Sequence, residues 1–113
     1  MNFEKEICEN IIIEKINLSR ATCREAEEFR NFIDVDINSD NVNYIINMER
    51  CEYIDSTFLG ILINTLKRIE KGNGKIKFVA VHDTIKLILA ITRIAEIFDI
   101  YEDNETALKS YAK

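Results

Sequence analysis

The chain has 113 residues, of which 47% are apolar, so it is long enough for one compact domain with a hydrophobic core and too short for two. Its formal charge of -5 argues against sequence-independent binding to nucleic acid or to anionic membranes, because both need a basic protein surface. We therefore expect a single domain over residues 1–113 that acts on a protein partner, without nucleic acid or membrane as a ligand.

The three cysteines, Cys8, Cys23 and Cys51, occur at unrelated spacings, with no Cys-x-x-Cys pair and no nearby histidine to complete a metal site. This pattern is typical of free thiols in a reducing cytosol. Segment 1–6 is charged, and no apolar run approaches the ~20 residues of a membrane span. The sequence predicts a cytoplasmic protein without a metal or cofactor.

The first half of the chain predicts an opening hairpin followed by a helix. Strands are expected over 3–7 and 11–16, separated by a polar turn at 9–10. The apolar residues that then recur at helical spacing are Ala26, Phe29 and Ile33, following Thr22. Ser19 or Thr22 is expected to cap this helix.

A polar cluster at 38–41 predicts a turn, and an interior strand over 44–48 leads on toward Asp55. A second helix is expected over 56–71 and ends at Gly72-Asn73-Gly74. Its residues at i, i+3, i+4 and i+7 spacing should face the sheet: Leu59, Leu62, Ile63, Leu66 and Ile69. Its polar residues Asn64, Lys67 and Lys71 should face water.

The last third of the chain predicts a strand, a helix, a strand and a helix, over 75–81, 84–94, 98–101 and 105–111. The helix over 84–94 is apolar almost all the way round, so it is either well buried or partly covered by a partner. The oligomeric state is therefore open between a monomer and a weak dimer. Strand-helix-strand units favour a partly parallel sheet, and hence the α/β class.

Asp55, Ser56 and Thr57 stand where the interior strand ends and the second helix begins. Hydroxyl groups at a helix start lie beside free backbone N–H groups and the positive end of the helix dipole, where a phosphate is well accommodated. Ser56 is therefore a candidate switch residue. The simpler alternative is N-capping, for which all three residue types are suited.

The segment Tyr53-Ile54-Asp55-Ser56-Thr57-Phe58-Leu59-Gly60-Ile61-Leu62, with this order of elements, resembles the STAS domain and, within it, the bacterial anti-sigma factor antagonists. The resemblance covers nearly the whole chain and implies a mixed β-sheet of about four to five strands with about four helices. In that family an Asp-Ser motif ends a strand, and its serine is phosphorylated by a partner that is both anti-sigma factor and kinase. Ser56 matches this serine, and Asp55 matches the preceding acid.

Two segments differ from the family pattern, the start of the second helix and residues 16–20, where the family often reads Gly-x-Leu-Asp and both the glycine and the aspartate are missing here. Phe58 stands where the family usually has glycine, and Ser19 stands where it often has an aspartate near the phosphoserine. The expected partner-binding residues are Ser19, Asp55, Ser56, Thr57, Phe58 and Ile61. For Phe58 and Ile61 the alternative is that Phe58 covers the edge of the core and Ile61 is a scattered exposed apolar residue.

The resemblance implies an anti-sigma factor antagonist that captures the anti-sigma factor when Ser56 is unmodified and releases it when Ser56 is phosphorylated. A serine phosphatase would reset it, and ATP and metal would belong to the kinase. The alternatives are a structural STAS subunit of a signalling scaffold and a nucleotide-binding or small-molecule-binding STAS module. The residues offer no complete acid-base, nucleophilic or metal constellation, so we do not expect an enzyme.

Overall fold

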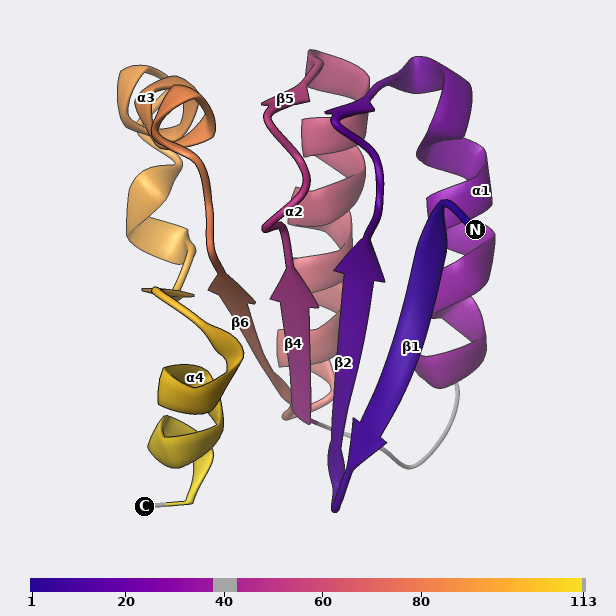
Figure 1. Ribbon diagram of the computed structural model, residues 1–113, viewed down its shortest axis with the longest axis vertical. Helices are drawn as coiled ribbons and strands as arrows, with labels where there is room; N and C mark the ends of the chain where they lie inside the picture. The colour runs from indigo at the N-terminus through magenta and orange to yellow at the C-terminus, as the bar shows by residue number, and fades with distance from the viewer. Residues whose placement is uncertain (38–42, 113) are drawn as a thin grey trace.

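The computed structural model describes residues 1–37 and 43–112. In these two ranges, five strands form the main sheet in the order β1-β2-β4-β6-β7 (Figure 1). Their bounds are Phe3–Cys8 (β1), Ile11–Ile16 (β2), Asn43–Asn47 (β4), Lys75–Val79 (β6) and Ile100–Tyr101 (β7). β1 runs antiparallel to β2, and every other neighbouring pair in this sheet is parallel.

Within the described residues, four α-helices connect or follow the strands, and two of them cover one face of the sheet. Their bounds are Cys23–Ile37 (α1), Ser56–Lys71 (α2), Asp83–Ile91 (α3) and Asn104–Tyr111 (α4), with a short 3-10 helix at Ala95–Ile97 (η1). α1 and α2 lie side by side behind the sheet in Figure 1. The mixed sheet and the helices confirm the predicted fold class.

Alternation along the strands divides the core between the two faces of the sheet. Ile12 and Ile16 of β2 pack with α1 and α2 in the larger apolar cluster. Ile11 and Ile13 belong to a smaller cluster that includes Ala107 of α4. α4 therefore covers the face opposite α1 and α2, which explains why β2 and β4 are apolar on both sides.

The structure adds a second sheet that the sequence does not predict. Two very short strands, β3 (Arg20–Ala21) and β5 (Tyr53–Ile54), pair in parallel outside the main sheet. The chain leaves β4 through a turn in which the Cys51 N–H donates to the Met48 carbonyl at 2.9 Å. The strand expected over 98–101 is also reduced to the two residues of β7. The turn expected at 38–41 lies outside the described residues.

One acidic side chain lies in the main apolar layer. Glu14 of β2 is fully buried, beside Lys5 of β1 and Asp36 of α1. Lys5 Nζ donates to Asp36 Oδ1 at 2.8 Å. Burial is the main cause that raises the pKa of Glu14 to about 9, and hydrogen bonding with Asp36 adds to it. Burial therefore favours the protonated, uncharged form of Glu14 at neutral pH.

All three cysteines are free thiols, with Cys23 exposed and Cys51 buried. Over the described part of the chain, no helix has the length and apolar character needed to cross a membrane.

Candidate partner-binding site at the start of α2

The starts of α1 and α2 meet at one end of the molecule, next to the β3-β5 pair (Figure 1). Backbone bonds join the two segments. The Glu52 and Tyr53 N–H groups donate to the Ser19 carbonyl at 2.8 and 3.1 Å, and the Asp55 N–H donates to the Ala21 carbonyl at 3.3 Å. Residues far apart in sequence therefore form one continuous surface around Ser56.

Asp55 links the two helix starts through its carboxylate. Oδ1 accepts the Phe58 N–H of α2 at 2.9 Å, and Oδ2 accepts the Cys23 N–H of α1 at 2.8 Å. The hydrogen bond from Phe58 is the main cause that lowers the pKa of Asp55 below its usual value. Asp55 is therefore an ionised cap shared by two helices, and of the three residues considered as caps of α2 it is the one that the structure uses.

α1 has its own capping arrangement. The Thr22 N–H donates to Glu25 Oε1 at 2.9 Å, and the Arg24 N–H donates to Thr22 Oγ1 at 3.3 Å. This is a capping box, in which the side chains of the first turn satisfy the free backbone donors. Of the two caps considered from the sequence, Thr22 is therefore the one that the structure uses, and Ser19 contributes its carbonyl to the β3-β5 pair instead.

Ser56 is the first residue of α2, and both Ser56 and Thr57 are exposed. Because Asp55 is the cap, the Ser56 hydroxyl is not used in capping. Within the described residues, neither this hydroxyl nor the backbone N–H groups of Ser56 and Thr57 have a hydrogen-bond partner in the protein. The hydroxyl is therefore open to a modifying enzyme, beside two free backbone donors.

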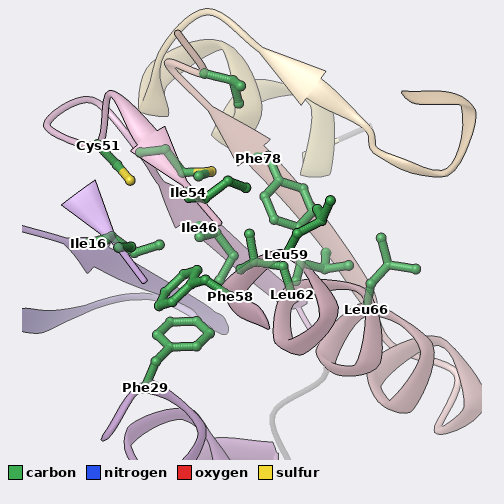
Figure 2. Close-up of a cluster of buried hydrophobic side chains, with 14 of the residues drawn as sticks. Ile16, Phe29, Ile46, Cys51, Ile54, Phe58, Leu59, Leu62, Leu66 and Phe78 are labelled. Carbon is green, nitrogen blue, oxygen red and sulfur yellow. The ribbon is translucent and has the colours of Figure 1, made fainter. Parts of the chain in front are cut away.

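The expectation that Phe58 belongs to the docking surface is wrong. Its side chain is 0% exposed, and its ring centroid lies 5.2 Å from that of Phe29 and 6.5 Å from that of Phe3. Figure 2 shows the Phe58 ring turned toward Phe29, inside the apolar cluster. Phe58 anchors the first turn of α2 to α1 and β1, so it cannot contact a partner in the folded protein.

Ile61 lies one turn further along α2 and is half-buried. It borders a shallow hollow of about 250 Å³ between α1 and α2, with Thr57, Gly60 and Arg30 among the lining residues. Of the predicted partner-binding residues, the structure therefore brings Ser19, Asp55, Ser56 and Thr57 together on one surface. Ile61 lies at the margin of this surface, and Phe58 does not belong to it.

One feature of this surface is absent from the sequence prediction. The Arg20 guanidinium lies 4.3 Å from the ring centroid of Tyr53, in a cation-aromatic contact across the β3-β5 pair. Arg20 is exposed. The contact holds a positive charge against β5, which ends two residues before Ser56. It depends on a pair of two-residue strands, which leaves no periodic signal in the sequence.

Removing the Asp55 carboxylate should weaken two helix starts at once. Asp103→Ala is a matched control, because Asp103 Oδ1 accepts one N–H, from Thr106 of α4 at 2.8 Å. We expect Asp55→Ala to lower the Tm by about twice as much as Asp103→Ala. The folded-state pKa of Asp55 is lowered, so its stabilisation is present above the unfolded-state pKa and disappears as the pH falls through the folded-state value. Thermal unfolding over an acid pH series checks both effects, and equal Tm losses would contradict the shared cap.

A sequence profile described as the STAS domain matches residues 5–107. The chain belongs to the STAS domain family. The STAS fold is also found by structural comparison: the chain superimposes on a crystal structure of a candidate anti-sigma factor antagonist from Thermotoga maritima with a TM-score of 0.91. That match has 22% identity and covers 98% of this chain and 95% of the other.

Two curated relatives of this STAS protein are named as anti-sigma factor antagonists. A protein of Thermotoga neapolitana, named as a candidate antagonist, is 25% identical over 111 residues, which are 95% of both chains. The anti-sigma-B factor antagonist of Staphylococcus aureus is 30% identical over 60 residues, which are 53% of this chain and 56% of that protein. The phosphorylated form of Bacillus SpoIIAA shares the fold, with a TM-score of 0.76, 16% identity, and coverage of 96% of this chain and 98% of the other.

Proposed function

We propose that this STAS domain is an anti-sigma factor antagonist whose unmodified form binds an anti-sigma factor that is also a serine kinase. Phosphorylation of Ser56 then releases that partner. The observation that carries the proposal is the exposed Ser56 hydroxyl, which stands at the start of α2 and is left free because Asp55 caps the helix. The names of the relatives along most of the chain support the antagonist role, and the solved phosphorylated form of SpoIIAA supports the presence of a phosphate on this fold.

The release follows from charge and space at the helix start. A phosphate on Ser56 adds roughly 1.5 to 2 negative charges next to the ionised Asp55 carboxylate. Asp55 already accepts the Phe58 N–H, so the phosphate can take only the remaining donors of the first turn, at Ser56 and Thr57. It therefore stands at the surface, where a closely packed partner meets steric conflict and added negative charge. A loss of about 3 kcal/mol weakens binding by more than a hundredfold.

The chemistry of the switch is assigned to the partners. The kinase transfers the terminal phosphoryl group of ATP to Ser56 Oγ, whose proton leaves, and a serine phosphatase hydrolyses the phosphate ester. ATP and its metal bind the kinase, and the STAS domain acts without catalysis as a single cytoplasmic domain over residues 1–113.

Capture experiments with variants of Ser56 test the proposal. Wild type and Ser56→Ala are expected to capture a kinase-type anti-sigma factor from the native cytoplasm, and Ser56→Asp is expected to lose it by at least about a hundredfold in affinity. Mass spectrometry of the recovered bait should find phosphate on wild type and none on Ser56→Ala. Thr106→Asp is the matched control, because Thr106 is an exposed hydroxyl residue in the first turn of α4, and it should bind as wild type does.

Identical partners for all variants, without phosphate on the wild-type bait, would overturn the switch. A stable high-mass assembly in that case would favour a structural STAS subunit of a signalling scaffold.

A further inference from the structure

α3 carries an exposed apolar surface that the fold does not use. Ile85 and Leu89 face the core, whereas Leu87 and Ile91 are 60% and 71% exposed. Ala90 is exposed as well, and the spacing 87, 90, 91 places these three side chains on one helix face. We call Leu87, Ala90 and Ile91 the α3 surface. The helix is therefore partly buried and partly available for a partner.

Cations stand at both ends of the α3 surface. Lys86 and Arg93 are exposed, and neither takes part in an ion pair within residues 1–37 and 43–112. The acid of this helix, Asp83, is exposed in the first turn, four residues before Leu87 and so on the same helix face, where the helix dipole favours its negative charge. An apolar strip between two unpaired cations is complementary to a partner segment that has an apolar face flanked by acidic residues.

Arg93 occupies a backbone position that favours glycine. Its N–H donates to the Ala90 carbonyl at 3.1 Å, the Ile94 N–H donates to the Leu89 carbonyl at 2.9 Å, and its φ is 60°. This is a Schellman end of a helix, in which the left-handed residue is usually glycine because a Cβ is unfavourable there. Glycine at this position would make the fold more stable, so the arginine side chain is present at a cost in stability.

The α3 surface lies at the same end of the molecule as Ser56. α3 contacts β5, and Ser56 follows β5 by two residues (Figure 1). The exposed Arg20 of β3 adds a third cation, which lies against Tyr53 of the same strand β5. The carboxylates of Asp55 and Glu25 are used by helix caps, so they offset these cations less than free acids would.

We propose that the α3 surface is a second docking site for the partner that binds at Ser56, and that it receives an amphipathic segment of that partner with acidic residues flanking its apolar face. This proposal rests on the proposed function for the identity of the partner. A second copy of the chain fits less well, because a symmetric contact would bring the same cations, Lys86 and Arg93, of both copies together.

Affinity measurements with surface variants test the proposal. The probe is the purified anti-sigma factor kinase that the Ser56→Ala bait captures, titrated calorimetrically. Ile91→Ser is expected to weaken binding by at least about tenfold. Val35→Ser is the matched control, because Val35 is 68% exposed near the opposite end of α1, and it should change the affinity by less than about twofold. Affinities for both variants within that range of wild type would overturn the proposal.

Arg93→Gly separates binding from folding. Glycine relieves the left-handed residue, so the Tm should rise by about 3 °C. The affinity for the same probe should fall by at least about fivefold, and its dependence on salt should be weaker than in wild type. A higher Tm with unchanged affinity would remove the arginine from the docking site.

The affinity of Ser56→Asp is measured together with these variants, so that a failure of the Ser56 switch can be distinguished from a failure of the α3 docking site. Loss of binding in Ile91→Ser but not in Ser56→Asp would retain the α3 surface and reject the switch, and the reverse result would reject the α3 surface alone. If the Ser56→Ala bait captures no such kinase, the proposed function fails. Light scattering then tests whether the α3 surface forms a dimer, and co-sedimentation with phosphatidylglycerol vesicles tests whether it binds a membrane. A dimer or vesicle binding that Ile91→Ser abolishes, or no association of any kind, would overturn the partner proposal.

Discussion

Phe58→Ala is expected to lower the free energy of unfolding by about 3–5 kcal/mol, the usual loss for a buried phenylalanine. The side chain is fully buried between α2, α1 and β1, where it contacts the rings of Phe29 and Phe3. Such a loss is a large part of the ~5–15 kcal/mol that stabilises a typical domain. Urea denaturation followed by circular dichroism measures it directly.

Ile61→Ala serves as the comparison, because Ile61 lies on the same helix and is only half-buried. We expect it to lower the free energy of unfolding by less than about 1.5 kcal/mol. If Phe58→Ala keeps wild-type stability and loses only partner binding, Phe58 would return to the docking surface predicted from the sequence.

The error at Phe58 has a physical origin in the neighbourhood of α2. A single-helix pattern identifies the stripe that faces the sheet, which contains Leu59, Leu62 and Leu66. α1 packs beside α2 and buries a second stripe, which includes Phe58 and Thr65. The apolar periodicity of α2 does not show which side of the helix α1 packs against. The second buried stripe could therefore not be predicted from the sequence of α2 alone.

Elements with local start and stop signals were predicted well. α2 has the predicted bounds because Asp55 caps its first turn and Gly72 ends it. The predicted helix over 84–94 instead ends at Ile91, because Arg93 takes a left-handed conformation that an arginine does not signal in a sequence. The β3-β5 pair depends on contacts between distant segments.

In the candidate site, too, features with a local sequence signal were predicted and features that depend on distant contacts were not. The sequence places Ser56 at a strand-to-helix junction, and the structure places it at the start of α2. The bond between Asp55 and the Cys23 N–H joins residues 32 positions apart and has no local signal. Asp55 therefore has a structural role in two helix starts, beyond the partner contact expected from its place in the motif.

Glu14→Gln is expected to raise the free energy of unfolding by up to about 3 kcal/mol at pH 7. The pKa of Glu14 is raised to about 9 in the folded protein from a usual value of 4.5. Between these pH values the unfolded chain releases the proton and the folded protein keeps it, so the stability of wild type falls as the pH rises. Glutamine does not titrate, and its amide can donate a hydrogen bond to Asp36 in place of the protonated carboxyl group.

The pH dependence of the free energy of unfolding distinguishes the loss of the titrating Glu14 carboxyl from a general gain in packing. The titratable groups around Glu14 are Lys5 of β1, Asp36 of α1 and Tyr44 of β4, and all three are retained in the variant. Urea denaturation of wild type and Glu14→Gln should give similar stabilities near pH 4.5 and diverge by about 1.4 kcal/mol per pH unit above it. Glu6→Gln, at an exposed position of β1, should leave the slope unchanged. A constant difference between wild type and Glu14→Gln across this range would show that Glu14 is ionised in the folded protein, and would place a buried negative charge between β2 and α1.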